Sequence, residues 1–517
     1  MVTHPQGQMR LAELIAAISL ATDLGTGQPT GHALRTCYLA MGLARELGVS
    51  VQDEFDTFYL ALLRFLGCTA EASDDATING GDDIALYAGV APFFMGAPTE
   101  ILGWMMRHLA EGERPLARVR AVTTALADPK GQQRSIRAHC EVGRMLSRRI
   151  GLGRGVQAAL GSAFERWDGK GLPDGVDGEA IPVASRIAIV ARDYDLLNRV
   201  CGPEEAERIL KERRGKAYDP KVLDGVLRHG TQLMREMEGG SLLEKVLAAE
   251  PGPEATIDAA HVDDVLGVFA HFTDLKSPFL RGHSTGVAEL AEKAGRVAGN
   301  TEPGLLRRAG LVHDLGRVAI PSGIWNKAGA LVDDEWERVR LHPYYSERIL
   351  VRCGPLEHLA EIASSHHERM DGSGYHRGSR AQALSTPARL LATADMFHAL
   401  TETRPYRGAM TLRQAADELE EACVEGRLDI TCVRAVLEAA GESSHPSRSR
   451  WPAELTDREV EVLRLLARGL SNKQVARELT LSPKTVGRHI EHIYAKAGVS
   501  TRAGATLFAM EEGLLTQ

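Results

Sequence analysis

One pattern occurs twice in this sequence, and the duplication limits the folds that the chain can adopt. Ser-Ala-Phe-Glu-Arg-Trp-Asp-Gly-Lys-Gly at 162–171 resembles Ser-His-His-Glu-Arg-Met-Asp-Gly-Ser-Gly at 365–374, 203 residues further along. The same spacing aligns residues 185–187 with residues 388–390, and His139 with His342. The first region is therefore predicted to be a diverged duplicate of the second.

Two stretches rich in helix-breaking residues mark the domain boundaries. They are EPGPEATID at 250–258 and the Ser/Pro/Arg-rich GESSHPSRSRWP at 441–452. Elsewhere apolar residues recur at helical spacing and alternating strand patterns are scarce. We expect an all-α protein with domains at 1–250, 258–440 and 453–517 and a linker at 441–452, which suits a length of 517 residues.

Composition and cysteine use point to the cytoplasm. The chain has 61 Lys and Arg against 69 Asp and Glu, so a basic surface over the whole molecule is excluded. Its seven cysteines form no CxxC pair, which is typical of reduced thiols. Neither a signal-peptide pattern nor an apolar run long enough to cross a bilayer is visible, so no membrane association is expected.

The two copies differ at the residues that can bind metal ions. The second copy has imidazoles and carboxylates: His283, His313, Asp314, His342, His366, His367 and Asp395. At the corresponding positions the first copy has His32, Arg64, Phe65, His139, Ala163, Phe164 and Arg192. A dinuclear hydrolytic site needs several imidazoles and a bridging carboxylate. Only the second copy is predicted to hold metals, with Asp314 as the bridge. His313 would bind one ion, with His283 and Asp395 completing one ion and His342, His366 and His367 the other, and which histidine takes which ion stays open.

The order His…HDLGR…His-Pro…HHERMDGSGY…Asp…RPYR closely resembles the HD-GYP family over about residues 270–440. The resemblance implies a tandem of HD-type helical domains, the first degenerate. It also implies a metal-dependent phosphodiesterase that hydrolyses the bacterial messenger cyclic di-GMP with two or three divalent ions, often iron or manganese. Family ligands fall on the seven residues of the second copy, and a bridging water is the nucleophile.

The sequence departs from the family at two places. Arg317 stands where the family's HDxGK motif has lysine, which keeps the charge but replaces a point charge by a planar fork. His376 breaks the GYP signature. The resemblance gives catalytic roles to Asp314 and Arg317. It gives substrate-binding roles to Arg317, Tyr375, Arg404 and Arg407.

Structural alternatives remain for several of these residues. The Asp-Gly-Ser-Gly run at 371–374 is typical of a turn, and its counterpart at 168–171 in the copy without ligands favours that interpretation. Tyr375 contacts substrate or only packs, and the two arginines of RPYR bind phosphate or cap helices. The segment from Cys68 to His139, with DDATINGGDD, is interpreted as a solvated loop.

The C-terminal 65 residues predict four short helices. Thr456 to Glu459 and Ser471 to Gln474 are capping boxes, Ser482-Pro483 starts a third helix, and a fourth follows Thr501. Apolar residues at i, i+3 and i+4 give each helix a buried face, and the third helix exposes polar residues on another face. From 471 to 502 six Lys and Arg face two Glu, a local charge of +4 that suits DNA phosphates.

This region is similar throughout to the LuxR-type helix-turn-helix. The family's usual DNA contacts map to Lys473, Lys484, Thr485, Arg488 and His489. A helical protein-interaction bundle is the alternative. DNA-binding domains of this type usually bind paired half-sites, so a homodimer on double-stranded DNA is expected.

Two functional hypotheses follow. The first is a cytoplasmic bacterial transcription regulator whose metal-binding domain senses a cyclic dinucleotide or another phosphoester. The second is primarily a cyclic di-GMP phosphodiesterase, or another HD-type phosphohydrolase, with an accessory DNA-binding module. Intact ligands favour turnover, whereas Arg317 and His376 favour binding without efficient hydrolysis.

Overall fold

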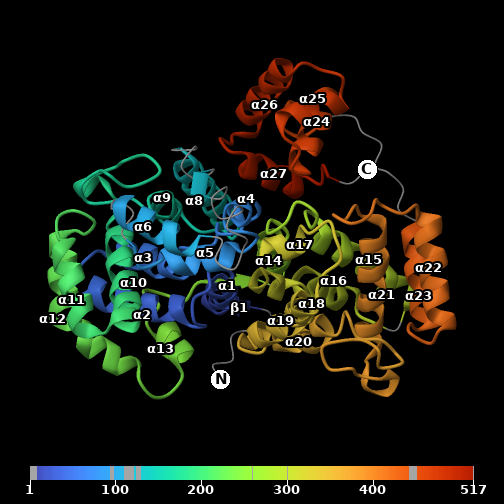
Figure 1. The fold of residues 1–517 in the computed structure, drawn as a ribbon. Coiled ribbons are helices and arrows are strands. Elements are labelled where there is room, and N and C mark those ends of the chain that lie inside the picture. Colours follow the sequence, from blue (N-terminus) through green and yellow to red (C-terminus); the bar gives the residue numbers. More distant parts are fainter. Residues whose placement is uncertain are drawn as a thin grey trace. The chain divides into compact units, whose positions relative to one another are not determined.

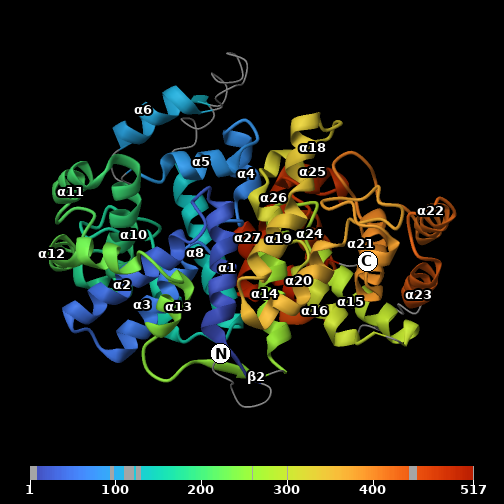
Figure 2. The same cartoon turned by 90° about the horizontal axis from the view of Figure 1, so that it is seen from below.

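The computed structural model describes residues 8–93, 98–109, 122–123, 130–258, 260–299, 301–441 and 451–515. These residues are almost entirely helical, as predicted (Figure 1). The described strands are β1 (Gln8–Arg10) and β2 (Thr256–Asp258), which pair antiparallel and tie the start of the first unit to its end (Figure 2). By contacts the chain divides into two units, Met1–Val262 and Asp263–Gln517.

The first unit is built from helices around a core of Leu, Ile and Ala side chains. In chain order they are α1 (Leu11–Gly25), α2 (His32–Leu47), α3 (Val51–Leu63), α4 (Ala72–Ile78), α5 (Asp83–Val90), α6 (Pro98–His108), α8 (Gly131–Arg149), α9 (Arg154–Gly161), α10 (Val183–Cys201), α11 (Pro203–Glu212), α12 (Pro220–Met237) and α13 (Leu242–Ala248). A 3₁₀ turn, η1 (Gly178–Ala180), precedes α10.

The second unit repeats much of this order and adds the C-terminal helices. It contains α14 (Val262–Asp274), α15 (His283–Ala298), α16 (Pro303–Val312), η2 (Leu315–Ala319), α17 (Ser322–Trp325), α18 (Asp333–Arg340), α19 (His342–Leu350), η3 (Gly354–Leu356), α20 (Glu357–Ser364), η4 (Ala381–Ala383), α21 (Thr386–Thr401), α22 (Leu412–Val424), α23 (Ile430–Gly441), η5 (Pro452–Glu454), α24 (Asp457–Ala467), α25 (Asn472–Glu478), α26 (Pro483–Ala497) and α27 (Arg502–Glu511).

The helix that begins with the first histidine is started in the same way in both units. A left-handed glycine precedes His32 in α2 and His283 in α15. In the first unit Asp23 accepts the Gly31 and Ala33 N–H groups, and in the second Asp274 accepts the Ser284 N–H. The carboxylate satisfies N–H groups that have no partner within the helix.

A second shared device is a glycine that allows two backbones to touch. A Cβ at Gly67 would overlap the His139 carbonyl, and a Cβ at Gly316 would overlap the His342 carbonyl. Each glycine lies three residues after the C-cap of the preceding helix, Arg64 after α3 and His313 after α16. In each unit this contact holds the segment after the helix against the backbone of the histidine, His139 or His342.

The interpretation of 68–139 as a solvated loop is wrong for the described residues. The DDATINGGDD segment forms the end of α4 and the start of α5. Asp75 accepts the Tyr87 hydroxyl at 2.6 Å, and Asp83 is fully buried. The acidic residues therefore cap and pair helices, and the remainder of this segment, at 94–97, 110–121 and 124–129, lies outside the described residues.

The C-terminal helices have the predicted caps and core. Both capping boxes are present, and Ser482 accepts the Thr485 N–H. Val462, Val475 and Val486 are buried, one from each of the first three helices. None of the described helices is long and apolar enough to cross a membrane.

Candidate metal centre

Helix ends and one helix centre bring the seven predicted ligands together. His283 and His342 each open a helix, α15 and α19, while His313 and Asp314 directly follow α16. His366 and His367 follow α20, and Asp395 lies in the middle of α21. All seven are buried except His367, which is partly buried. Residues separated by more than a hundred positions thus form one cluster.

Asp314 lies at the centre of this cluster. Its Oδ2 is 3.0 Å from His313 Nε2 and 3.5 Å from His283 Nε2. Its Oδ1 is 3.4 Å from the Nε2 atoms of both His342 and His366. Each carboxylate oxygen therefore faces its own pair of imidazoles, which is the arrangement of a bridging ligand.

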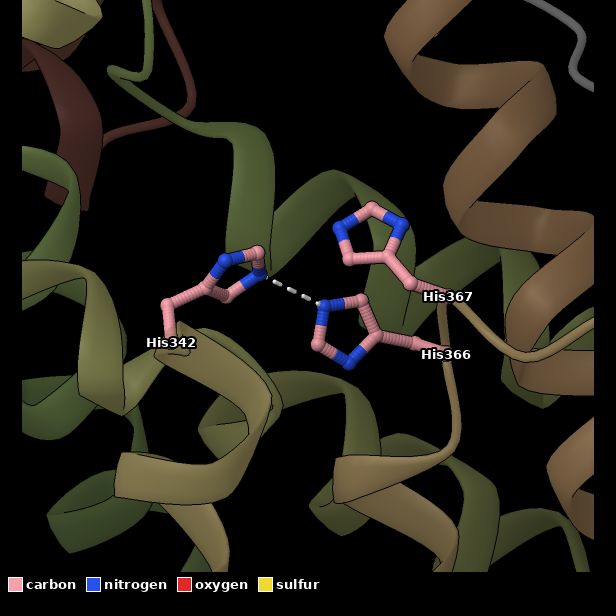
Figure 3. Close-up of side chains that lie close together, drawn as sticks. All are labelled: His342, His366 and His367. Carbon is pink, nitrogen blue, oxygen red and sulfur yellow. Dashed lines mark hydrogen bonds between the residues drawn. The ribbon is translucent and has the colours of Figure 1, made fainter. Parts of the chain in front are cut away.

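The remaining ligand atoms complete two sets. Asp395 Oδ1 lies 3.1 Å from His283 Nε2 and 3.7 Å from His313 Nε2. His367 joins His342 and His366 in a second set, whose ligand atoms lie within 4.8 Å of one another (Figure 3). The assignment of these sets to two separate ions stays a prediction.

Hydrogen bonds on the far side of the rings fix which nitrogen faces the cluster. The Nδ1 atoms of His313, His342 and His366 lie 2.6–2.7 Å from the carbonyl oxygens of Gly310, Val339 and Ala363, respectively. A carbonyl only accepts, so each Nδ1 carries a hydrogen and each Nε2 faces the cluster, where it offers a lone pair when the ring is neutral. His283 donates its Nδ1–H to Glu402 at 2.8 Å in the same sense.

Several hydrogen-bond acceptors of the cluster face one another, and a bound cation would relieve this arrangement. His342 Nε2 and His366 Nε2 are only 3.1 Å apart (Figure 3). Asp314 Oδ1, His313 Nε2 and His367 Nε2 are buried with no hydrogen-bond partner among the described residues. Buried acceptors without donors are costly, and imidazole and carboxylate are ligands of divalent transition metals. The residues fit a divalent metal centre.

Burial and charge set the protonation of these groups. Burial lowers the pKa of His342 to about 4 and the pKa of His367 well below its usual range. Burial opposes ionisation of Asp314, but Arg317 and His313 outweigh it and hold the pKa of the carboxyl far below its ordinary value. For His313 burial is outweighed by the charges of Asp314 and Asp395, which raise its pKa to about 10. Burial of His283 is likewise outweighed by Glu402 and Asp395, which raise its pKa. A metal binds neutral imidazoles and an ionised carboxylate, so these two rings release a proton when a metal binds.

Arg317 contacts the cluster itself. Its Nη1 lies 2.8 Å from Asp314 Oδ2, and its Cζ lies 5.2 Å from the centre of the Trp325 ring. After Asp314 the chain tightens into the 3₁₀ turn η2, and the Arg317 guanidinium turns back to the carboxylate. Its Nε has no partner among the described residues. Its role toward substrate phosphate stays a prediction.

The other predicted substrate residues have different surroundings. The Tyr375 ring centre is 4.6 Å from that of His367 and 6.3 Å from that of His342, so Tyr375 borders the second set of ligands. Arg404 donates to the Phe279 carbonyl and to Glu402, at 2.8 Å each. Arg407 donates to the carbonyls of Ala399 and Leu400 at the end of α21, which are contacts of a helix cap.

Sequence reasoning missed two residues beside His283. Glu402 accepts the His283 Nδ1–H, and His398 Nδ1 lies 3.4 Å from the other Glu402 oxygen. His398 lies on α21 three residues after Asp395, and Glu402, seven residues after Asp395, is the C-cap of that helix; this spacing was the available signal. Asp274, the carboxylate upstream of His283, accepts the Ser284 N–H and hydroxyl.

The predicted DNA contacts lie on two helices of the C-terminal region. Lys473 lies on α25, and Lys484, Thr485, Arg488 and His489 lie on α26. Lys473, Lys484 and Arg488 are exposed. Two of the six cations counted above serve the fold: Lys496 pairs with Glu459 at 2.7 Å, and Arg502 donates to the Leu470 carbonyl. The free positive charge is therefore smaller than the sequence count.

Comparison with known families agrees with this geometry. The family described as HD domain matches residues 130–222 and 267–431, and the family described as bacterial regulatory proteins, luxR family, matches residues 453–509. The chain is an HD-GYP-like protein fused to a LuxR-type DNA-binding domain. The HD match reaches into both units, which agrees with the internal duplication.

Curated relatives of this HD-GYP-like protein are cyclic dinucleotide phosphodiesterases. The 3'3'-cGAMP-specific phosphodiesterase 3 of Vibrio cholerae is 29% identical over 84% of this chain and 95% of its own length. A cyclic di-GMP phosphodiesterase of Pseudomonas aeruginosa is 33% identical over 36% of this chain and 48% of its own. The crystal structure of a Vibrio cholerae cyclic GMP-AMP phosphodiesterase superposes with a TM-score of 0.59, 27% identity, and coverage of 85% of this chain and 99% of that one.

Proposed function

We propose that the second unit hydrolyses a cyclic dinucleotide at a dinuclear metal centre and that the LuxR-type domain carries this activity to DNA. The observation that supports this most strongly is the position of Asp314, whose two oxygens face separate pairs of imidazoles. A carboxylate with only a structural role would not be expected to have four imidazoles around it.

We assign the metal ligands by these contacts. His283, His313 and Asp395 would hold one ion, His342, His366 and His367 would hold the other, and Asp314 would lie between them. Iron or manganese suits the mixture of imidazole and carboxylate. A metal pair held there would supply Lewis-acid polarisation of a phosphoester and activation of a water near neutral pH.

The chain's own residues orient the substrate and keep the ligands in their binding forms. Backbone carbonyls hold the imidazoles in one tautomer, and Arg317 keeps Asp314 ionised. The Arg317 Nε, which has no partner among the described residues, is available to a substrate phosphate. Tyr375, beside His367, offers a ring on which a guanine or adenine base can stack.

The substrate is proposed from the relatives. Those named for 3'3'-cGAMP and those named for cyclic di-GMP both match this chain, and the relative that covers most of it is named for 3'3'-cGAMP. The two molecules share the cyclic phosphodiester backbone and differ in one base. We therefore propose 3'3'-cGAMP alongside cyclic di-GMP as substrate.

We further propose that the LuxR-type domain binds double-stranded DNA as a homodimer. Lys484, Thr485 and Arg488 lie near the start of α26, and the two cations are exposed. A helix that presents such residues at its N-terminal end suits entry into the major groove. Two half-sites are addressed by two copies of the domain.

The test of the enzyme is turnover with a matched inactive variant. Protein purified without chelator is analysed for metals and then incubated with each dinucleotide and Mn²⁺. We expect about two metal ions per chain and a linear product, and loss of both in Asp314→Ala. Tight binding without product from either dinucleotide would make the second unit a sensor. The absence of both binding and product would contradict the proposal.

DNA binding is tested separately by substitution on α26. Arg488→Ala is expected to weaken DNA binding by roughly tenfold or more, since one base or phosphate contact is lost. Arg413→Ala, an exposed arginine of α22, is the control with unchanged affinity at the same salt concentration. Equal affinity of Arg488→Ala and the unsubstituted protein would remove Arg488 from the interface.

A further inference from the structure

In the first unit, arginines stand where the second unit has metal ligands. Arg64 is the C-cap of α3, the place that His313 has after α16, and Arg192 on α10 aligns with Asp395 on α21. Phe65 and Phe164 replace Asp314 and His367. These four residues, Arg64, Phe65, Phe164 and Arg192, are called the guanidinium cluster below.

The four side chains of the guanidinium cluster are close together. Arg64 Cζ is 4.8 Å from the centre of the Phe164 ring and 5.8 Å from that of Phe65. Arg192 Cζ is 6.0 Å from the Phe65 ring centre. Both guanidinium groups therefore contact Phe65, in the position that the bridging carboxylate has in the other copy.

Within the described part of the chain, Arg64 is buried and forms no ion pair of its own. Only 4% of the residue is exposed, and neither its Nε nor its Nη1 has a hydrogen-bond partner among the residues that the structure describes. The faces of Phe65 and Phe164 attract the charge, but they do not accept the in-plane N–H groups. A buried, unsatisfied guanidinium is costly, so the arrangement calls for an acceptor.

The charged groups around Arg64 do not neutralise it. Arg192 donates to Asp193 at 2.6 Å and to the Ala91 carbonyl, and Asp193 also accepts the Tyr218 hydroxyl. Asp195 is taken by His32 and Arg35. Burial and the charge of Arg192 lower the pKa of Arg64 to about 10, so Arg64 is still a cation at neutral pH.

The nearby uncharged groups do not supply the missing acceptor. His139 Nε2 donates to the Arg64 backbone carbonyl at 2.9 Å, which holds the C-cap in place but leaves the guanidinium free. The Nε of Arg192 is also buried with no partner among the described side chains and backbone groups. Two guanidinium groups thus keep unused donors around the same ring.

We infer that the guanidinium cluster binds the phosphoryl group of a small anion, either inorganic phosphate or a nucleotide. Two guanidinium forks match the tetrahedral oxygens of phosphate better than a single carboxylate or a halide does. In the second unit metal ions would bind the phosphoester, whereas in the first unit the positive charges belong to arginine side chains. It would therefore bind a phosphate without metal and without hydrolysing it.

The test uses the full-length chain, treated with chelator so that metal-dependent binding in the second unit is removed. Titration calorimetry measures binding of inorganic phosphate, GMP and cyclic di-GMP. Arg64→Gln removes the charge, and Arg208→Gln is the control, since Arg208 is an exposed arginine of α11 paired with Glu205. The DNA-binding face also attracts anions, but its contribution is the same in both variants.

We expect saturable binding that weakens at least about tenfold in Arg64→Gln and changes by less than about twofold in Arg208→Gln. GMP that binds more tightly than phosphate identifies a nucleotide as the ligand, and equal affinity identifies free phosphate. If none of the three probes binds, or if Arg64→Gln binds as tightly as the unsubstituted chain, the inference is wrong and Arg64 only fills space.

A second pair of variants covers the case in which Arg64→Gln does not fold. Arg64→Lys keeps one charge but loses the fork, and Arg192→Gln removes the second guanidinium. Both are expected to weaken phosphate binding and to reduce the rise in thermal midpoint that phosphate causes in the unsubstituted chain. Unchanged affinity in both would overturn the inference. Because the assay measures binding without metal, its result does not depend on whether the second unit hydrolyses dinucleotides.

Discussion

The two HD-type units share a scaffold but have opposite charge at its centre. Gly67 and Gly316 make the same backbone contact, and Asp23 and Asp274 start the same helix. At the centre, however, the second unit has imidazoles and carboxylates, and the first has two guanidinium groups. The comparison separates residues that maintain the fold from residues that decide which ion the fold accepts.

The Asp-Gly-x-Gly segments belong to the shared scaffold. Gly169 and Gly372 both have positive φ, 70° and 83°. Glu165 accepts the N–H groups of Asp174 and Gly175, and Glu368 accepts those of Arg377 and Ser379. The same turn occurs with and without metal ligands, so it is a structural element in both units.

The largest expected effect concerns a buried histidine of the first unit. Burial lowers the pKa of His139 to about 4. In the unfolded chain its pKa is near 6.5, so the unfolded state takes up a proton first as the pH falls. The stability that neutral His139 contributes is present above pH 6.5 and is lost toward pH 4, by up to about 3 kcal/mol.

Chelator-treated protein is compared with His139→Gln by denaturant unfolding between pH 7 and pH 4. The variant is expected to lose less stability over this range, because it has no imidazole to protonate. Parallel curves for the two proteins would show that His139 is not the group that titrates.

An intermediate effect is expected from the carboxylate behind His283. Glu402→Ala removes the acceptor of the His283 Nδ1–H and is expected to weaken metal binding about 10- to 100-fold. The aligned residue of the first unit, Arg199, donates to Gln28 instead. Competition with a metal-binding dye measures the affinity, and Arg199→Ala is the matched control with no change. Equal metal affinity of Glu402→Ala and the unsubstituted chain would contradict this role.

The smallest effect is expected in the shared turn. Asp371 accepts the N–H and hydroxyl of Ser373 and points to no metal ligand in the contacts described. Asp371→Ala should leave the metal content unchanged and the hydrolysis rate within about twofold. Metal analysis with a rate measurement checks this. A large loss of metal would give the turn a role in the second unit that its counterpart at Asp168 lacks.

The sequence was sufficient for the helical class and for choosing seven residues that the structure brings together; their grouping around two ions stays a prediction. Their chemical types and order are local facts, and the duplication showed which positions changed. The partner of Arg317 could not be predicted, because it depends on η2 replacing a turn of α-helix. Glu402 was missed because an orienting carboxylate has no motif of its own. The helices at 72–90 were missed because their acidic residues are satisfied by tertiary contacts.

Three imidazoles of the candidate metal centre are each hydrogen-bonded to the backbone of their own segment. His313, His342 and His366 each donate to the carbonyl of the residue three positions earlier. The orientation of each ring is thus set by one turn of its own backbone and does not depend on distant parts of the domain. An incoming ion meets rings already facing it, so loading and unloading of the centre should proceed without rebuilding the surrounding helices.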